Sequence, residues 1–265
     1  MLPIFLVYHT HSLLKILKII VITNQGIHIQ SAFKNQEILW ADIKAIRLLG
    51  KESWWFQSVE ATTLFLHSGE KVVIINALYR NMPLLKTTLN TVKRKYLRGE
   101  IFNVENLLYH KLQPIKVNLS DGEFDEYKGD SFFSLNGFTL LMFLGIALWG
   151  LIILVVEKQT NGVFLIIFSF LFGGLAAYQL NYFLLGKDYL VVKNHIWIPY
   201  AKTYALADIE EVVFDSVGES SDGLRIITKD FVSTFYPAGS LRDKAWQKLA
   251  KELRKRKIKI RSKFF

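Results

Sequence analysis

Two uncharged apolar runs divide the chain and predict two membrane-spanning helices. The first covers residues 138–156 (FTLLMFLGIALWGLIILVV), and the second covers residues 163–185 (VFLIIFSFLFGGLAAYQLNYFLL). About 20 apolar residues are enough for a helix to cross a hydrocarbon core roughly 30 Å thick. Because the short polar link EKQTNG connects the runs, we expect an antiparallel transmembrane hairpin over residues 132–185. The alternative, a pair of buried helices in a soluble core, is disfavoured because neither run has a polar face.

Small residues recur in both runs and predict close helix packing. Such residues allow two helices to approach each other in lipid, either within the hairpin or between copies of the chain. The candidates are Gly145, Gly150, Gly173, Gly174 and Ala177. Neither run contains an ionisable residue, which argues against an ion or proton pathway.

The distribution of basic residues predicts the orientation of the hairpin. The link contains one Lys and one Glu, and every other Lys and Arg lies outside the hairpin. By the positive-inside rule, we expect both termini on the cytoplasmic side of the inner membrane. Residues 1–22 lack the order of a secretory signal, since Lys15 and Lys18 follow the first short apolar run. We expect this segment to be folded protein or an interfacial helix.

A shorter phrase occurs twice, once on each side of the apolar runs. Residues 40–48 read WADIKAIRL, and residues 206–214 read LADIEEVVF. In both copies the phrase follows two strands of alternating apolar residues, and it precedes a third alternating strand. A hairpin turn is then expected near Ser68-Gly69 or Lys229-Asp230, and a helix ends each copy. In the second helix the apolar residues at helical spacing are Leu241, Ala245, Leu249 and Leu253.

This order, a strand-rich segment closed by one helix and then repeated, resembles the pleckstrin-homology-like (PH-like) domains of bacterial membrane proteins. The resemblance covers roughly residues 15–98 and 186–258. It implies an α+β membrane protein in which two small PH-like domains, each a bent antiparallel sheet with a C-terminal helix, flank one two-helix transmembrane hairpin. The corresponding segments are a first domain at 1–99, a linker at 100–131, a second domain at 186–258 and a basic tail at 259–265.

The resemblance implies a binding module for lipid headgroups or proteins, without fixing the ligand. Phosphoinositide-binding relatives use basic residues in the first strand–strand loop. The corresponding loops here offer only Lys34 and Lys202, so phosphoinositide binding is not supported. The repeated phrase is expected to be structural, with Asp42 and Asp208 forming a turn or capping backbone amides. Trp40 is expected to be a core or edge aromatic.

Three adjacent aromatic residues, Trp54, Trp55 and Phe56, stand apart from this pattern. Three neighbours in one loop cannot all point into a core. They are candidates for contact with a partner or with the membrane interface, where Trp is favoured. A loop that packs on its own domain is the alternative.

Positive charge gathers near the C-terminus. Residues 248–263 contain nine basic residues and one acidic residue, which gives +8 of the formal net charge of +10. Anionic headgroups attract basic residues by about 1 kcal/mol each near the surface, although a solvated face is an equal alternative. Nucleic acid is not expected as a partner, because no stacking platform lies beside this segment. The candidates for membrane-surface contact are Lys248, Lys251, Arg254, Lys255, Arg256, Lys257, Lys259 and Arg261, with Lys93, Arg94 and Lys95 in the first helix.

Side chains suited to catalysis or metal binding are sparse. The chain has no cysteine, which excludes disulfides and thiolate chemistry. His9 and His11 share one face of an extended segment, but no carboxylate follows at a useful spacing. Residues 121–130 (DGEFDEYKGD) lack the ligand order of a calcium loop and are predicted to be a solvated linker. Since no phosphate loop or nucleophile elbow occurs, we expect no enzyme activity, no metal and no cofactor.

The first functional hypothesis is a membrane-anchored scaffold that binds a protein partner or an anionic lipid surface and associates with itself. An exposed sheet edge on either domain is a candidate site for a strand added by a partner. The alternative hypothesis is an oligomerising effector whose hairpins permeabilise or remodel the bilayer.

Overall fold

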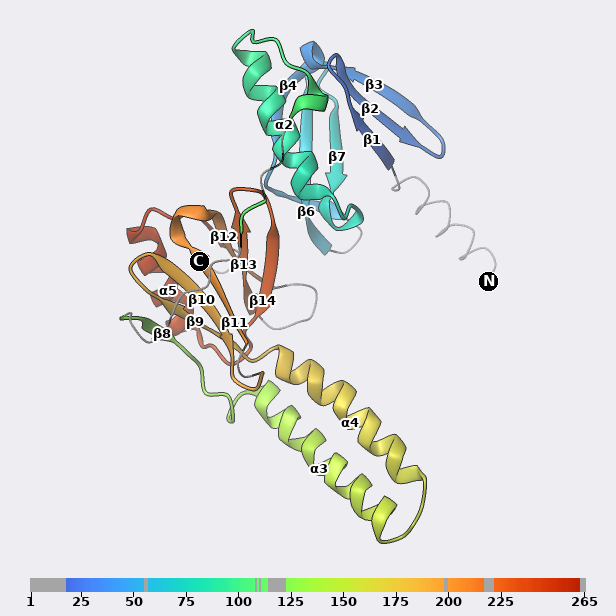
Figure 1. Ribbon diagram of the computed structural model, residues 1–265, viewed down its shortest axis with the longest axis vertical. Helices are drawn as coiled ribbons and strands as arrows, with labels where there is room; N and C mark the ends of the chain where they lie inside the picture. The colour runs from blue at the N-terminus through green and yellow to red at the C-terminus, as the bar shows by residue number, and fades with distance from the viewer. Residues whose placement is uncertain are drawn as a thin grey trace. The chain divides into compact units, whose positions relative to one another are not determined.

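The structure is a computed structural model of the 265-residue chain (Figure 1). It describes residues 18–54, 57–107, 109, 111–113, 123–197, 200–216 and 222–262. The chain divides into two compact units, Met1–Lys111 and Leu112–Phe265, which we call the first and the second unit. Both units are mixed α+β assemblies built mainly from antiparallel sheets, and the second unit also contains two long apolar helices.

The first unit contains two sheets and one long helix. Its strands are β1 (Lys18–Ile22), β2 (Gly26–Ser31), β3 (Asn35–Leu39), β4 (Ile43–Arg47), β5 (Lys51–Trp54), β6 (Gln57–Leu66) and β7 (Lys71–Ile75). The first sheet has the order β1-β2-β3, and in the second sheet β6 pairs with β4, β5 and β7. A 3₁₀ turn, Trp40–Asp42, joins the sheets, and helix α2 (Met82–Leu97) follows β7.

The second unit repeats this plan with β8 added to its first sheet and β15 added to its second sheet, which has no counterpart of β5. Its strands are β8 (Asp125–Tyr127), β9 (Asn181–Leu185), β10 (Tyr189–Asn194), β11 (Ala201–Ala205), β12 (Ile209–Ser216), β13 (Asp222–Thr228), β14 (Ser233–Pro237) and β15 (Ile260–Ser262). The sheets have the orders β11-β10-β9-β8 and β14-β13-β12-β15. Helix α5 (Asp243–Lys255) buries Trp246, Leu249, Ala250 and Leu253, a spacing that places one apolar face on the core.

The two units agree even in their irregularities. Strands β1-β2-β3 correspond to β9-β10-β11, and β4, β6 and β7 correspond to β12, β13 and β14. The pairing shifts register directly after Ile43 in the first unit and directly after Ile209 in the second. The turn between β6 and β7 and the turn between β13 and β14 each have a residue with left-handed backbone conformation at the same position. These residues are Gly69, with φ of 87°, and Phe231, with φ of 61°. The internal repeat predicted from the sequence is therefore present in the fold.

The repeated phrase forms the joint between the two sheets of each unit. In both copies it makes a 3₁₀ turn that leads into the next strand. The backbone carbonyl of Asp42 accepts a hydrogen bond from the amide of His67 at 2.9 Å, and that of Asp208 accepts one from Lys229 at 2.8 Å. Trp40 is buried and donates through Nε1 to the carbonyl of Thr23 at 3.2 Å. The phrase is thus structural, as predicted, and the backbone of the Asp residues makes these bonds.

Helices α3 (Leu135–Val155) and α4 (Asn161–Tyr178) form the predicted hairpin. The Ser134 side chain caps α3 by accepting a hydrogen bond from the amide of Gly137 at 3.0 Å. The predicted end of the second span at Leu185 is wrong, because α4 ends at Tyr178 and residues 181–185 form β9. The apolar run continues past the helix because β9 lies inside a sheet with a core on one face, and an interior strand is as apolar as a spanning helix.

Other predicted boundaries also shift. Residues 125–127 lie in the predicted linker but form β8 in the second unit, and residues 102–107 pack against the core of the first unit. Residues 260–262 lie in the predicted basic tail but form β15, which pairs in parallel with β12. Short segments of this kind carry too few residues for a periodic signal, so the sequence pattern did not identify them.

Buried amides join α4 to the sheets of the second unit. Only Gln179 and Leu180 lie between α4 and β9. Asn194 donates through Nδ2 to the carbonyl of Ala177 at 2.9 Å, and Asn181 donates to the carbonyls of Tyr178 at 2.9 Å and Pro237 at 2.7 Å. Helix ends leave their last carbonyls without partners in the helix interior, and these side chains add donors there, where the amide of Leu180 also bonds to the carbonyl of Ala177.

We expect Asn194→Ala to destabilise the protein by about 1–3 kcal/mol. The substitution removes the donor to Ala177 and the acceptor for the backbone amides of Ile196 and Trp197. Thermal unfolding of the detergent-solubilised protein measures the change, and Gln247→Ala, which removes an exposed amide on α5, is the matched control. Equal melting temperatures for the two variants would contradict this account.

Candidate membrane and partner-binding surfaces

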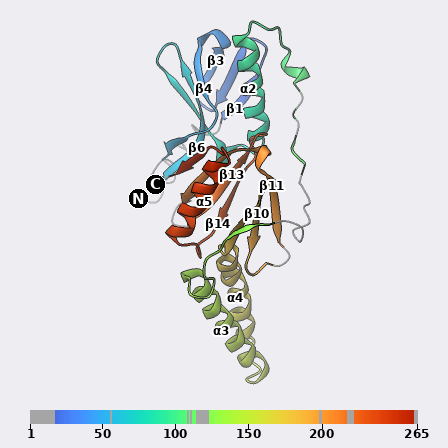
Figure 2. The same ribbon diagram turned by 90° about the vertical axis from the view of Figure 1, so that its left-hand side faces the viewer.

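Helices α3 and α4 are long and apolar enough to cross a membrane. Only 11 % of the apolar window of α3 and 28 % of that of α4 is buried within the protein. Figures 1 and 2 show the helices side by side, projecting away from the sheets of the second unit. An exposed apolar surface of this extent is unfavourable in water and fits a location in a membrane.

Aromatic rings fill the contact between the two helices. Phe143 of α3 lies 5.8 Å from Phe168 and 5.7 Å from Phe172 of α4, measured between ring centroids. The hydroxyl of Ser169 donates to the carbonyl of Leu165 at 2.7 Å, so this polar group is satisfied within its own helix. The contact is therefore apolar at these residues.

Some of the predicted small residues lie in this contact. A Cβ atom on Gly150 would lie 2.9 Å from the carbonyl oxygen of Gly162, and one on Gly173 would lie 3.5 Å from Cβ of Phe143. Ala177 is buried where α4 joins the sheets. Gly162 was missed in the sequence because it belongs to the polar link by composition, although it lies in the first turn of α4.

The other predicted small residues do not pack within the hairpin. A Cβ atom on Gly145 or on Gly174 would have no atom outside its own helical turn within 4 Å. These positions are open on the surface of the hairpin. They leave room for lipid or for a helix of another copy to approach.

We expect Gly150→Val to weaken the hairpin by about 1–3 kcal/mol, because the added side chain meets the backbone of α4. Gly145→Val is the matched control, since it adds the same side chain at an open position of the same helix. The loss of stability of both variants is measured by unfolding in mixed detergent micelles with a rising fraction of dodecyl sulfate. A larger loss for Gly145→Val would show that the two helices do not pack in this manner.

Large apolar side chains stay exposed where the hairpin meets the sheets. They are Phe132, Phe133, Tyr178, Ile196, Trp197 and Tyr200. Trp197, in the β10–β11 connection, and Gly173 and Gly174 line a shallow apolar groove of about 210 Å³. Trp and Tyr are favoured at membrane–water interfaces, and this belt fits such a location. The sequence analysis missed Trp197, since one aromatic residue in a strand connection has no periodic partner.

The predicted basic surface separates into two groups. Lys248, Lys251, Arg254, Lys255 and Lys257 are exposed on or just after α5, and Arg256 is partly buried. The exposed side chains match the predicted membrane-facing charge in position, although their contact with lipid remains a prediction.

Lys259 and Arg261 have a structural role that the sequence did not indicate. Their side chains lie 3.6 Å and 3.2 Å from the carboxylate of Glu211, whose side chain is only 3 % exposed. A buried carboxylate requires a charged partner, and β15 brings these residues beside β12. We therefore assign Lys259 and Arg261 to the fold of the second unit.

The basic cluster of the first unit is less exposed than its sequence suggests. Arg94 is exposed on α2, but Lys93 and Lys95 are partly buried. The Nζ atom of Lys93 lies 3.5 Å from the carbonyl oxygen of Ile46. This cluster therefore offers less charge to a surface than the α5 group does.

The aromatic triplet begins within a strand. Trp54 ends β5, pairs with Gln57 of β6 and is half-buried. Trp55 and Phe56 lie outside the described residues. Their contact with a partner remains a prediction.

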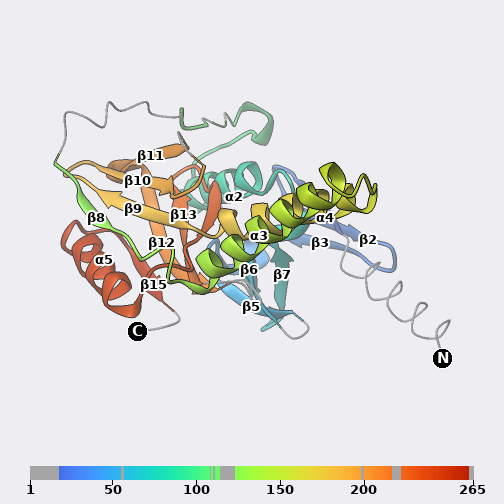
Figure 3. The same ribbon diagram turned by 90° about the horizontal axis from the view of Figure 1, so that it is seen from below.

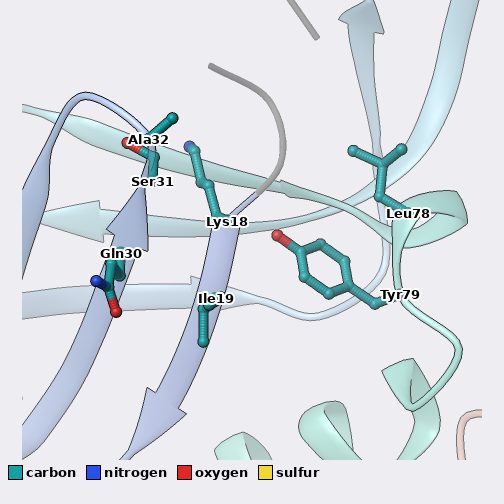
Figure 4. Close-up of a pocket in the computed structure, with 7 residues that line it drawn as sticks. All are labelled: Lys18, Ile19, Gln30, Ser31, Ala32, Leu78 and Tyr79. Carbon is teal, nitrogen blue, oxygen red and sulfur yellow. The ribbon is translucent and has the colours of Figure 1, made fainter. Parts of the chain in front are cut away.

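A depression of about 490 Å³ lies at the start of β1 in the first unit (Figure 4). It is lined by Lys18, Ile19, Gln30, Ser31, Ala32, Leu78 and Tyr79. The Tyr79 hydroxyl is directed at β1 and hydrogen-bonds to the backbone of Lys18. A second depression of about 320 Å³ shares Lys18 and is also lined by Lys34 and Lys71. Burial and the charge of Lys34 both lower the pKa of Lys18, so this region favours an added negative charge.

Sequence reasoning missed these depressions because their residues are far apart along the chain. Lys18 belongs to β1, Lys34 to the β2–β3 connection and Lys71 to β7. Lys34 was recognised only as an isolated loop residue. The antiparallel pairing of β1 with β2, and of β6 with β7, brings these ends of the strands together.

The described histidines belong to no candidate metal-binding cluster. Among the described residues, no group of three or more His, Asp or Glu side chains is placed to hold a metal ion. Burial and the nearby Lys128 lower the pKa of His195, whose ring lies 4.7 Å from that of Tyr182. His9 and His11 lie outside the described residues.

No protein-family model matches the chain, and no curated protein matches it. The functional interpretation therefore rests on the residues and their arrangement.

Proposed function

We propose that this protein is a membrane-anchored scaffold on the cytoplasmic side of the inner membrane. Its two units act as PH-like binding modules for a protein partner or an anionic lipid surface, and it associates with itself. The observation that carries the proposal is the uncovered apolar hairpin, whose second helix continues directly into β9 of the second unit. Such a hairpin serves as an anchor, because its contact region is apolar and its spans contain no Asp, Glu, Lys, Arg or His.

The order of elements supports the PH-like assignment. Each unit has a three-stranded antiparallel array, then a second sheet, then one helix that covers the core. The absence of a catalytic motif from the sequence favours binding over catalysis. Sheet edges and helix faces of this kind bind extended or helical segments of other proteins.

Exposed charge supports an additional contact with acidic lipid. Lys248, Lys251, Arg254 and Lys257 present positive charge on one helix end of the unit that carries the hairpin. Each such residue near an anionic surface contributes about 1 kcal/mol of attraction. This contact would orient the second unit and would not by itself select a partner.

The proposed topology predicts one-sided chemical labelling. Because the natural chain has no cysteine, Thr160→Cys in the α3–α4 link and Lys257→Cys after α5 each supply a single thiol. In spheroplasts, we expect a membrane-impermeant maleimide to label Thr160→Cys and to leave Lys257→Cys unlabelled, with the reverse in inverted vesicles. Labelling of both variants from the same side would exclude a transmembrane hairpin.

The scaffold proposal predicts a defined assembly after gentle detergent extraction from the native membrane. We expect native mass spectrometry to show several copies of the chain or one reproducible second protein. A monomer that carries only anionic lipid would argue against a protein partner. In that case, Lys251→Gln with Arg254→Gln should remove the lipid, and Arg80→Gln, on an exposed residue before α2, should not.

A second candidate function is an oligomerising effector that permeabilises the bilayer. The open positions at Gly145 and Gly174 favour it, because they leave room for a hairpin of another copy. The scaffold proposal expects dye-loaded vesicles to remain sealed when the protein is reconstituted into them. Leakage that is lost in Gly174→Leu would favour the effector instead.

A further inference from the structure

A shallow groove lies along the hairpin where it joins the sheets of the second unit. Helix α3 contributes Leu144 and Ala147 to its lining, and α4 contributes Ser169, Gly173 and Gly174. A further wall comes from the connection between β10 and β11, which follow β9 in one sheet (Figure 3). Two helices and a sheet connection therefore border a space of about 210 Å³.

The groove covers the half of the hairpin that lies next to the sheets. On α4 its lining extends from Ser169 to Ala177, a distance of about 12 Å at a rise of 1.5 Å per residue. Helix α4 ends one residue later, at Tyr178. Half of the hydrocarbon core of a bilayer is about 15 Å thick. In a hairpin that spans the membrane, as proposed, the groove thus has nearly the length of one leaflet.

The lining offers few polar groups to a ligand. The hydroxyl of Ser169 already donates to the carbonyl of Leu165 at 2.7 Å. The indole of Trp197 belongs to the sheet connection, so it lies at the end of the groove next to the sheets. The other lining residues are Leu, Phe, Ala, Gly and Ile. A lining of this kind fits a hydrocarbon chain, because a polar ligand would lose its hydrogen bonds to water there.

The groove is continuous with the exposed apolar surface of the hairpin. Leu144 and Phe170 line it and are 57 % and 75 % exposed. A helix of a second copy is about 10 Å wide, and one that lay along the groove would meet Ile196 and Trp197 at its end. A lipid chain can end at that level, because its headgroup lies at the membrane–water interface, where Trp is favoured.

We propose that this groove holds one acyl chain of a phospholipid from the leaflet next to the second unit. The chain lies on Gly173 and Gly174 between Leu144 and Phe170, and its glycerol end lies beside Trp197. Burial of apolar surface provides the affinity, so the groove selects the hydrocarbon chain and not the headgroup. The inference rests on the proposed membrane anchor, and it adds a lipid site that does not use the basic side chains of α5.

Two open glycines allow a test that keeps the contact between the helices. A Cβ atom on Gly174 would have no atom outside its own helical turn within 4 Å, so Gly174→Leu fills the groove without meeting α3. Gly145→Leu is the matched control, because Gly145 is also open but does not line the groove. Both variants should unfold at the same fraction of dodecyl sulfate as the natural chain.

The amount of retained lipid measures occupancy of the groove. The full chain is reconstituted into nanodiscs of phosphatidylcholine, extracted with a mild detergent and analysed by native mass spectrometry. We expect the natural chain and Gly145→Leu to retain one phospholipid per chain, and Gly174→Leu to retain at least about tenfold less. Trp197→Ser, which removes a wall outside the helices, should also lower retention. Nanodiscs of phosphatidylglycerol should give the same amounts.

A phosphatidylcholine with a photoreactive diazirine in its acyl chain tests the orientation of the chain. A diazirine near the glycerol should crosslink to Trp197. One near the methyl end should crosslink to Ala147 or Ser169, which lie at the other end of the groove. Gly174→Leu should remove both crosslinks. Crosslinks that persist in this variant would assign the lipid to another part of the hairpin surface and would overturn the inference.

Three results of mass spectrometry would also overturn it. Equal retention by Gly174→Leu and the natural chain would show that the groove is not the lipid site. Loss of lipid in both Gly174→Leu and Gly145→Leu would indicate a general effect on the hairpin surface. A dimer without retained lipid that Gly174→Leu disrupts would assign the groove to a second copy.

Failure of this inference is distinguishable from failure of the anchoring proposal. If thiol labelling supports a transmembrane hairpin and Gly174→Leu retains as much lipid as the natural chain, the anchor stands and the groove site is wrong. If the labelling pattern excludes a transmembrane hairpin, the anchoring proposal fails whatever lipid is retained.

Discussion

Two buried asparagines determine how the apolar hairpin is attached to the rest of the second unit. Asn181 and Asn194 donate hydrogen bonds to the carbonyls of Tyr178 and Ala177 at the end of α4. The residues between helix and strand are held as well, because the carbonyl of Gln179 accepts from Gly239 at 2.9 Å and that of Leu180 accepts from His195 at 3.0 Å. No free linker therefore separates α4 from β9, and the neighbours of β9 take their places from this joint. Those neighbours include β8 and the connection that carries Trp197.

In the second unit, an additional strand covers one edge of each sheet. Strand β8 covers the outer edge of β9, and β15 covers the outer edge of β12 and brings its basic side chains to buried Glu211. Exposed strand edges attract further strands, so proteins usually cover or charge them. In the first unit, the edge of β1 is flanked by lysines and a depression. The two copies of the plan thus differ in which sheet edges they cover among the described residues.

Much of this fold could be predicted because its patterns are long or repeated. The helical hairpin could be predicted from the length of the two uncharged apolar runs. The repeat could be predicted from the phrase around Asp42 and Asp208, together with the strands and the helix around each copy. The end of α4 could not be predicted from apolarity, because a buried strand such as β9 continues the same composition. Strands β8 and β15 have three residues each, which is too few to show an alternation of apolar and polar residues. They are strands because they pair with the edges of β9 and β12. The depression at Lys18 depends on strand pairing, which no local pattern encodes.

In a hairpin that spans the bilayer, as proposed, the joint between α4 and β9 would couple the second unit to the thickness of that bilayer. Helix α4 has 18 residues and α3 has 21, which correspond to about 27 and 32 Å at a rise of 1.5 Å per residue. A hairpin adapts to a thinner or thicker bilayer mainly by tilting. Because α4 passes into β9 without a hinge, a tilt of the helices turns the sheet by a similar angle. The tilt of the hairpin, which depends on the thickness of the bilayer, would then change the direction in which α5 and its basic side chains face.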